Sequence, residues 1–225
     1  MIDKRVDSAD AAIEGVGDGA TVMISGFQSS GTPNALLEAL LAKNLRGLIL
    51  VVNGVGHHGT RVATLFERGC VAKVICSSAR AGSGRPGPFE EQWKRGEVEL
   101  ELVPQGTLAE RIRAGAAGIA GFYTPVAVGT KLAEGKEVRD FEGKEYVLER
   151  AISGDLSILR ADKADRWGNL TYHAGQRNFG TVMAMASRIT AVEVNEIVAG
   201  ALDPEQVVTP GIFVKRVVAL PDLRG

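Results

Sequence analysis

Residues 20–53 read ATVMISGFQSSGTPNALLEALLAKNLRGLILVVN, and this stretch decides the fold. It opens with an apolar, β-branched run at 20–25 that predicts a strand. The helical stretch that follows has four leucines on one face, Leu36, Leu37, Leu40 and Leu41. Thr32 suits the N-cap of this helix and Pro33 its first position, where a missing N–H costs nothing. The continuous apolar run at 48–53 then predicts a strand buried on both faces, which completes a βαβ unit.

The same alternation continues outward along the chain, with helical patterns near 61–68 and 89–95 and strand patterns at 71–76 and 98–103. It predicts an α/β fold with an open, doubly wound, mainly parallel sheet. Farther on, the runs 138–141 and 146–149 flank Glu142-Gly143-Lys144, which is typical of a hairpin turn. More strands are expected at 155–160, 189–194 and 212–218. Because no low-complexity linker interrupts the chain, we expect a single domain over residues 1–225 with a hairpin excursion near its middle.

Composition and charge argue against two classes of function. The formal net charge is −1 and only 5% of the residues are aromatic, so neither the basic footprint nor the stacking platforms of nucleic-acid binding are expected. The N-terminus lacks the apolar core of a signal peptide, and the longest apolar runs are too short to span a bilayer, which predicts a cytoplasmic protein without a membrane partner. Cys70 and Cys76 are expected to be small buried thiols.

The loop between the first strand and the first helix consists of Ser25, Gly26, Phe27, Gln28, Ser29, Ser30 and Gly31. Glycine-rich turns of this kind let backbone N–H groups face a phosphate or an oxyanion, and the positive end of the next helix favours an anionic ligand. It is not a P-loop, because no Lys-Ser or Lys-Thr follows Gly31. On physical grounds alone, a binding loop and a plain strand-to-helix connection explain this 25–31 loop equally well.

A second glycine pattern, Gly54-Val55-Gly56-His57-His58-Gly59, matches the dinucleotide fingerprint G-x-G-x-x-G. A dinucleotide site also needs an acidic residue at the end of the next strand, but that strand ends in Cys76-Ser77-Ser78. The adjacent His57 and His58 and the isolated His173 belong to no cluster at ligand spacing. We therefore expect no metal site and interpret all three as surface or core histidines.

The polar loop at 103–107 contains Gln105 at the end of a strand and before a helical stretch. Ligands of open α/β sheets bind at the carboxyl ends of strands, so the Gln105 amide is well placed to donate to a developing oxyanion; a turn-capping glutamine is the alternative. Glutamates followed by glycine occur at Glu14, Glu134 and Glu142, but none has an activating sequence environment. No Gly-x-Ser-x-Gly elbow is present either, so the residues alone reveal no nucleophile.

Several long motifs occur in a fixed order. The first is made of Asp18-Gly19, Val22-Met23-Ile24, Gly26-Phe27, Gly31 and Pro33; the later ones are VPQGTLAERIR at 103–113, the glycine-rich segment 118–130, DRWGNLTY at 165–172, RNF at 177–179 and VTPG at 208–211. Over nearly its whole length the sequence thereby resembles the alpha half of the family I CoA transferases. Ser25 is a departure, since the family usually has glycine there.

This resemblance implies a three-layer CoA transferase-like fold and a ping-pong transfer of CoA between carboxylic acids, in which a glutamate attacks the thioester. In the family that glutamate lies in a Ser-Glu-Asn-Gly context of the beta half, a sequence that this chain lacks. The resemblance therefore implies a beta-subunit partner in an α2β2 assembly, a CoA thioester as substrate and no permanently bound cofactor. It assigns CoA binding to the 25–31 loop, an oxyanion-donor role to Gln105 and a substrate-side position to Asn53, which Gly54 follows where the family often has a second asparagine.

The leading hypothesis is thus the alpha subunit of a CoA transferase that uses succinyl-CoA and either acetoacetate or 3-oxoadipate. The run at 165–172 is slightly closer to the 3-oxoadipate type. The alternatives are a sugar-phosphate isomerase on the related fold, one half of an acyl-CoA hydrolase, and a non-catalytic CoA-binding subunit.

Overall fold

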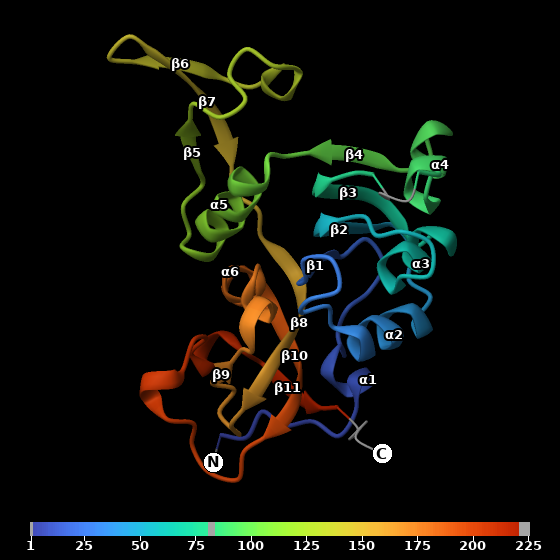
Figure 1. Ribbon diagram of the computed structural model, residues 1–225, viewed down its shortest axis with the longest axis vertical. Helices are drawn as coiled ribbons and strands as arrows, with labels where there is room; N and C mark the ends of the chain where they lie inside the picture. Colours follow the sequence, from blue (N-terminus) through green and yellow to red (C-terminus); the bar gives the residue numbers. More distant parts are fainter. Residues whose placement is uncertain (1, 81–83, 221–225) are drawn as a thin grey trace.

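The computed structural model describes residues 2–80 and 84–220, and its main feature is one large sheet (Figure 1). The order along this sheet is β11-β10-β8-β1-β2-β3-β4, with β9 attached to β8. Its strands are β1 (Thr21–Ile24), β2 (Leu48–Gly54), β3 (Val71–Ser78), β4 (Glu99–Leu102), β8 (Gly154–Ala164), β9 (Leu170–Thr171), β10 (Ser187–Ile197) and β11 (Arg216–Ala219). Every pairing along the main path is parallel, while β9 runs antiparallel to β8. The predicted open, mainly parallel α/β sheet is confirmed.

The order of the strands reverses next to β1. From β1 the chain proceeds through β2, β3 and β4 toward one edge, whereas β8, β10 and β11 extend the sheet on the other side. Such a reversal is a topological switch point, and ligands of open α/β sheets bind in the crevice outside the carboxyl ends of the strands there. The 25–31 loop leaves β1 at this point.

Helices cover both faces of the sheet, which gives the expected three layers (Figure 1). On one face lie α1 (Ala9–Ala12), α2 (Asn34–Ala42), α3 (Arg61–Glu67) and α4 (Pro88–Lys94), and on the other α5 (Gln105–Ala116) and α6 (Gly180–Met185). Side chains of β1 alternate between the two cores: Val22 and Ile24 pack on the first and Met23 on the second. Within the described ranges, no helix is both long and apolar enough to cross a bilayer.

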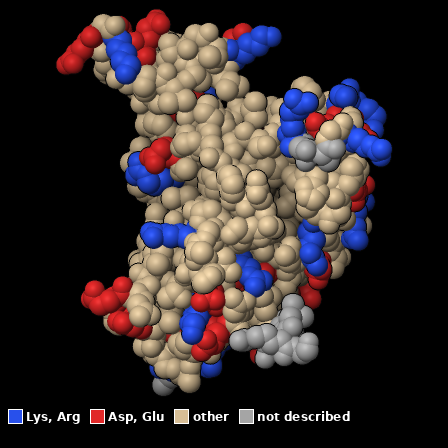
Figure 2. Space-filling view, in the orientation of Figure 1, with Lys and Arg blue, Asp and Glu red and all other residues tan. Residues whose placement is uncertain are grey.

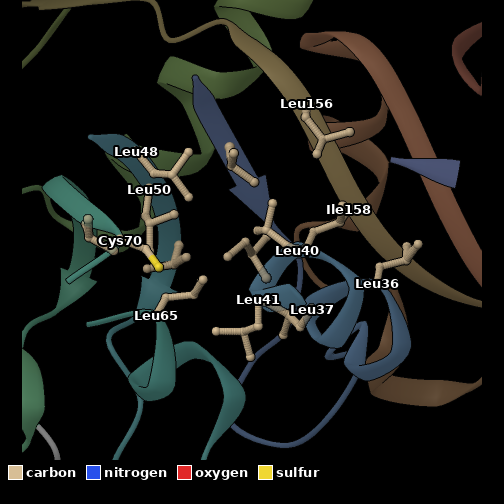
Figure 3. Packing of buried hydrophobic residues seen from close by; sticks show 14 of the residues in the cluster. Leu36, Leu37, Leu40, Leu41, Leu48, Leu50, Leu65, Cys70, Leu156 and Ile158 are labelled. Atoms are coloured by element: carbon tan, nitrogen blue, oxygen red, sulfur yellow. The ribbon is translucent and has the colours of Figure 1, made fainter. Parts of the chain in front are cut away.

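The four leucines of α2 account for much of the first core, as predicted. Leu36, Leu37, Leu40 and Leu41 are all buried, and their side chains lie among those of the neighbouring strands and of α3 (Figure 3). They belong to the same cluster as Leu48 and Leu50 of β2 and Leu156 and Ile158 of β8. One helix therefore packs across strands on both sides of β1 and secures the switch point, because each buried leucine contributes about 1.5–3 kcal/mol of transfer free energy.

The predicted hairpin is present, but it belongs to a second sheet. Strands β6 (Val138–Phe141) and β7 (Lys144–Arg150) pair antiparallel around a turn in which Glu142 and Gly143 have positive φ values of 56° and 80°. Strand β5 (Gly121–Thr124), which the sequence patterns did not reveal, pairs with the other edge of β7. The result is a small antiparallel sheet of order β5-β7-β6 beyond β4 and α5 (Figure 1).

An ion-pair network joins the two sheets. Arg111 of α5 bonds Glu101 of β4 at 2.6 Å and the Arg150 carbonyl of β7 at 2.6 Å, and it lies 3.7 Å from Glu149 of β7. Lys136 bonds Glu149 at 2.6 Å. These side chains line a cavity of about 350 Å³ between the sheets. Glu149 is only 1% exposed, and its ion pairs with Arg111 and Lys136 offset the desolvation cost of burying its carboxylate.

Some expected boundaries are wrong. Helix α2 begins at Asn34 with Pro33 as its N-cap, so Thr32 does not cap it; the Thr32 hydroxyl instead donates to the Gln28 carbonyl at 3.1 Å. The last strand begins only at Arg216, because the chain first forms a 3-10 turn, η4 (Gly211–Phe213). The other 3-10 turns are η1 (Lys131–Ala133), η2 (Ala174–Arg177) and η3 (Pro204–Gln206).

Candidate functional site

Polar side chains from neighbouring elements meet at the carboxyl edge of the main sheet. Asn53 and Ser77 are the last residues but one of β2 and β3, and Gln105 is the first residue of α5, which follows β4. Gln105 Nε2 donates to Asn53 Oδ1 at 2.6 Å, and Ser77 Oγ lies 2.9 Å from both Asn53 Oδ1 and the Asn53 carbonyl. The structure thus brings together two residues singled out from the sequence and adds Ser77, which the sequence analysis quoted only as the end of a strand.

This arrangement leaves hydrogen-bond donors available. The Gln105 amide donates to Asn53 Oδ1, and the one hydroxyl hydrogen of Ser77 is shared between Oδ1 and the Asn53 carbonyl. With Oδ1 turned toward these donors, the Asn53 Nδ2 group points away from Ser77 and Gln105. A primary amide nitrogen carries two hydrogens, and Gln105 uses one of them on Asn53. Within the part of the chain that the structure describes, neither Asn53 Nδ2 nor the second Gln105 hydrogen has a protein partner. Fixed donors of this kind are suited to stabilising an oxyanion.

The 25–31 loop begins next to this cluster, because Ile24 pairs with Val52 and the following residues are Ser25 and Asn53. Ser25 itself is buried: its Oγ donates to the Gly31 carbonyl at 2.9 Å and accepts from Arg160 N at 3.3 Å. The Ser25 side chain therefore closes the loop internally. Gln28, Ser29 and Ser30 form the exposed tip, and Phe27 is 44% exposed.

Two glycines are required by the geometry of this loop. Gly26 has a φ of 127° and a Cβ there would lie 2.8 Å from Thr32 Oγ1. Gly31 has a φ of 71° and a Cβ would lie 2.7 Å from the Gln176 carbonyl, in the turn η2. The loop is consequently packed tightly against residues 174–178, which are distant in sequence and include Asn178, a residue for which the sequence suggested no role.

The amino ends of the two longest helices differ electrostatically. At α2 the Glu193 carboxylate of β10 accepts from Ala35 N at 2.8 Å and Leu36 N at 3.0 Å, and Arg160 pairs with it at 3.1 Å. Burial raises the pKa of Glu193 and outweighs these hydrogen bonds, which lower it. The expectation that the α2 end attracts an external anion is therefore wrong for these two N–H groups, since an internal carboxylate occupies them. The end of α5, at Pro104 and Gln105, has no side-chain cap.

The remaining candidates lie away from this edge or have structural roles. Directly after the 54–59 segment, Thr60 caps α3 by accepting from Ala63 N at 3.4 Å. Within the segment, the exposed His57 and His58 rings bond main-chain carbonyls. No group of three or more His, Cys, Asp or Glu side chains among the described residues is suited to a metal ion. Glu14, Glu134 and Glu142 are all exposed. Cys70 and Cys76 are buried free thiols, as expected.

The fold is that of an α/β protein in which polar side chains and available hydrogen-bond donors gather at the carboxyl ends of parallel strands, where ligands of open α/β sheets bind. A family model described as Coenzyme A transferase matches residues 6–220. The chain belongs to the coenzyme A transferase family, which confirms the resemblance found in the sequence.

Individual relatives show which members of the family this chain is similar to. The chain is 46% identical over 221 residues to the A subunit of 3-oxoadipate CoA-transferase from Pseudomonas putida, covering 98% of this chain and 95% of that protein. It is 43% identical over 217 residues to the A subunit of succinyl-CoA:3-ketoacid coenzyme A transferase from Helicobacter pylori, covering 96% and 92%.

Among solved structures, an acyl-CoA transferase of Escherichia coli O157:H7, in a thioester complex with CoA, matches with a TM-score of 0.83 at 22% identity. The match covers 98% of this chain and half the length of that protein. At this identity the structural match supports the fold alone.

Proposed function

We propose that this chain is the alpha subunit of a two-subunit 3-oxoacid CoA transferase, which moves CoA between succinyl-CoA and acetoacetate or 3-oxoadipate. The observation that carries the proposal is the near-full-length identity to relatives named as the A subunits of enzymes with these acceptors. The same relatives favour a transferase over the hydrolase and isomerase alternatives. Their names also imply a second subunit, and we place the nucleophilic glutamate on it because this chain has no Ser-Glu-Asn-Gly sequence.

In the proposed reaction a carboxylate oxygen of the partner's glutamate attacks the thioester carbonyl of succinyl-CoA. The C–S bond breaks, CoA leaves as the thiolate, and an acyl-glutamyl anhydride remains. The thiolate then attacks the glutamyl carbonyl, releasing succinate and leaving a glutamyl-CoA thioester. The acceptor carboxylate attacks this thioester, and the same steps run in reverse to give the new acyl-CoA. Splitting the exchange in this way replaces one difficult step by easier ones.

Each acyl transfer passes through a tetrahedral intermediate with a negatively charged oxygen. Gln105 supplies a donor to this oxygen, with the Asn53 carboxamide beside it on the substrate side. Both groups are held in place by the hydrogen bonds among Asn53, Ser77 and Gln105, so little reorganisation is needed as the charge develops. The uncapped amino end of α5 adds a favourable dipole.

The 25–31 loop is the proposed contact for the CoA moiety. Because the Ser25 hydroxyl is used inside the loop, binding falls to the backbone and to the exposed tip, Gln28, Ser29 and Ser30. CoA acts as a substrate and no cofactor stays bound between turnovers. We further propose an α2β2 assembly in the cytoplasm. The face shown in Figure 2 fits a small-molecule enzyme, since basic and acidic side chains are interspersed around its rim and form no basic stripe.

The deciding experiment measures CoA transfer from succinyl-CoA to acetoacetate and to 3-oxoadipate, by this chain alone and co-purified with its partner subunit. Transfer only in the presence of the partner supports the proposal, and the preferred acid identifies the acceptor. Hydrolysis of succinyl-CoA without transfer to either acid would instead favour the hydrolase. Turnover by the chain alone would contradict the half-enzyme assignment.

A further inference from the structure

The 25–31 loop is closed on itself and has few attachments to the rest of the protein. Phe27 and Ser30 exchange backbone hydrogen bonds at 3.0 Å, and the Thr32 hydroxyl bonds the Gln28 carbonyl. At its start, Ser25 N donates to the Ile158 carbonyl of β8 at 3.2 Å. Beyond Ser25, the hydrogen bonds that tie the loop to other regions of the described chain all go to one side chain, that of Asn178.

Asn178 uses both ends of its carboxamide. Its Oδ1 accepts from Gly26 N at 3.1 Å and from Phe179 N at 2.6 Å. Its Nδ2 donates its two hydrogens among three carbonyls within hydrogen-bond distance, those of Ser30 at 3.1 Å, Gly175 at 2.8 Å and Gln176 at 3.2 Å. One amide thus holds the first and the last part of the loop against residues 174–179. Neither an aspartate nor an aliphatic side chain can reproduce this pattern of acceptor and donor.

We propose that Asn178 is a positioning residue for acyl-CoA binding, acting through the 25–31 loop; this inference rests on the proposed function of that loop. Without Asn178, Gly26 N loses its partner and the Ser30 carbonyl keeps only the hydrogen bond from Phe27 inside the loop. Beyond Ser25, no hydrogen bond among the described residues then ties the loop to another region, and its position depends on packing against residues 174–178. A ligand binds more weakly in proportion to the fraction of molecules in the competent conformation. The apparent affinity for acyl-CoA therefore falls, while the acid acceptor, bound at the Asn53–Gln105 edge, is affected much less.

The test compares Asn178→Ala and Asn178→Asp with the wild-type complex of both subunits. Loss of two ordinary hydrogen bonds to the loop predicts a rise of about tenfold in KM for succinyl-CoA, with KM for the acid changed less than about twofold. Asn178→Asp keeps an acceptor for Gly26 N, but its second carboxylate oxygen faces three carbonyl oxygens and repels them. The KM of Asn178→Asp for succinyl-CoA should therefore rise at least as much as that of Asn178→Ala. If Asn178→Ala does not assemble, Asn178→Ser, which keeps one hydroxyl, is measured instead.

A matched control is Asn169→Ala. The Asn169 carboxamide also joins two loops, accepting from Gly211 N at 2.8 Å and donating to Asp165 at 2.8 Å, but it belongs to the β8–β9 connection and has no hydrogen bond to the 25–31 loop in the described chain. Asn169→Ala should lower the Tm of the complex without a selective rise in KM for succinyl-CoA. Unchanged KM for succinyl-CoA in folded Asn178→Ala, a wild-type-like Asn178→Asp, or an equal rise for both substrates would overturn the inference.

Binding of CoA by titration calorimetry separates this inference from the proposed function. Should the wild-type complex bind CoA but transfer it to neither acid, the proposed reaction fails. The Asn178 inference is then tested by CoA affinity alone, and the Kd of Asn178→Ala for CoA is expected to be about tenfold higher than that of wild type. Equal CoA affinity of wild type and Asn178→Ala would overturn it regardless of turnover.

Discussion

Replacing Gln105 with alanine removes a hydrogen-bond donor from the carboxyl edge of the sheet while leaving the surrounding packing almost unchanged. Gln105 is exposed at the first position of α5, and Asn53 Oδ1 keeps the hydrogen bond from Ser77 after the substitution. Removal of one oxyanion donor costs about 2.7–4 kcal/mol of transition-state stabilisation, so kcat is expected to fall by about 10²- to 10³-fold. The substitution also removes the hydrogen bond from Gln105 to Asn53, so the free energy of unfolding is expected to fall by about 0.5–1.5 kcal/mol.

The assay is steady-state CoA transfer by the purified two-subunit complex, together with thermal unfolding and size-exclusion chromatography. Gln105→Glu keeps the size of the side chain but replaces its N–H donors with an anion, and it should be at least as slow as Gln105→Ala. Gln206→Ala, at an exposed position of η3, serves as a control with wild-type kinetics. If an assembled Gln105→Ala complex keeps kcat within about threefold of wild type, Gln105 does not stabilise the oxyanion.

Other predictions concern stability and reactivity. Glu149→Ala leaves Arg111 and Lys136 without their shared buried carboxylate and should lower the free energy of unfolding in urea by about 3–5 kcal/mol. The control Glu145→Ala removes an exposed carboxylate and should leave that free energy nearly unchanged. Equal effects of the two substitutions would refute the stabilising role of the ion-pair network. Burial raises the pKa of Glu101, but hydrogen bonds from Arg111 and Lys73 outweigh it and hold that pKa below its usual 4.5. The stabilisation that this lowered pKa provides is fully present above pH 4.5 and is lost as the pH falls through the folded-state pKa of Glu101. The Tm difference between wild type and Glu101→Gln should therefore shrink on acidification. A Tm difference that stays constant with pH would contradict this prediction. Burial raises the pKa of the Cys76 thiol to about 12, so iodoacetamide should modify Cys76 only after unfolding.

The sheet was predictable because its local signals agree with one another. Residues 20–53 contain two apolar strand runs around a helix with one apolar face, and the structure shows that βαβ unit, with Leu37 and Leu40 buried as expected. Helix ends were less predictable, because an N-cap side chain can come from a distant part of the chain. Nothing near Thr32 or Pro33 reveals that Glu193, about 160 residues away, binds the first N–H groups of α2. Strand β5 was missed because four residues beginning with glycine carry no clear period.

The site was predictable only one residue at a time. The position of Gln105 after a strand indicated the edge on which it lies, since all parallel strands present their carboxyl ends together, whereas Asn53 was implied only by the family resemblance. Their mutual hydrogen bond depends on the register between β2, β3 and β4, which no local pattern encodes. The contacts of Asn178 could not be predicted from the sequence, because its partners Gly26 and Ser30 are about 150 residues away. An asparagine in a polar segment is most simply interpreted as a turn residue.

The amino ends of α2 and α5 differ in whether a side chain binds their first N–H groups. Both α2 and α5 begin at the carboxyl edge of the sheet, and both would attract an anion through their exposed N–H groups. At α2 the buried Glu193, which is paired with Arg160, already accepts from the first N–H groups, so these groups are not available to a second anion. At α5 the first turn has no cap, and the Gln105 and Asn53 amides stand beside it. We therefore infer that the oxyanion forms next to α5, while the 25–31 loop at α2 contacts the uncharged pantetheine part of CoA through its backbone and hydroxyl groups.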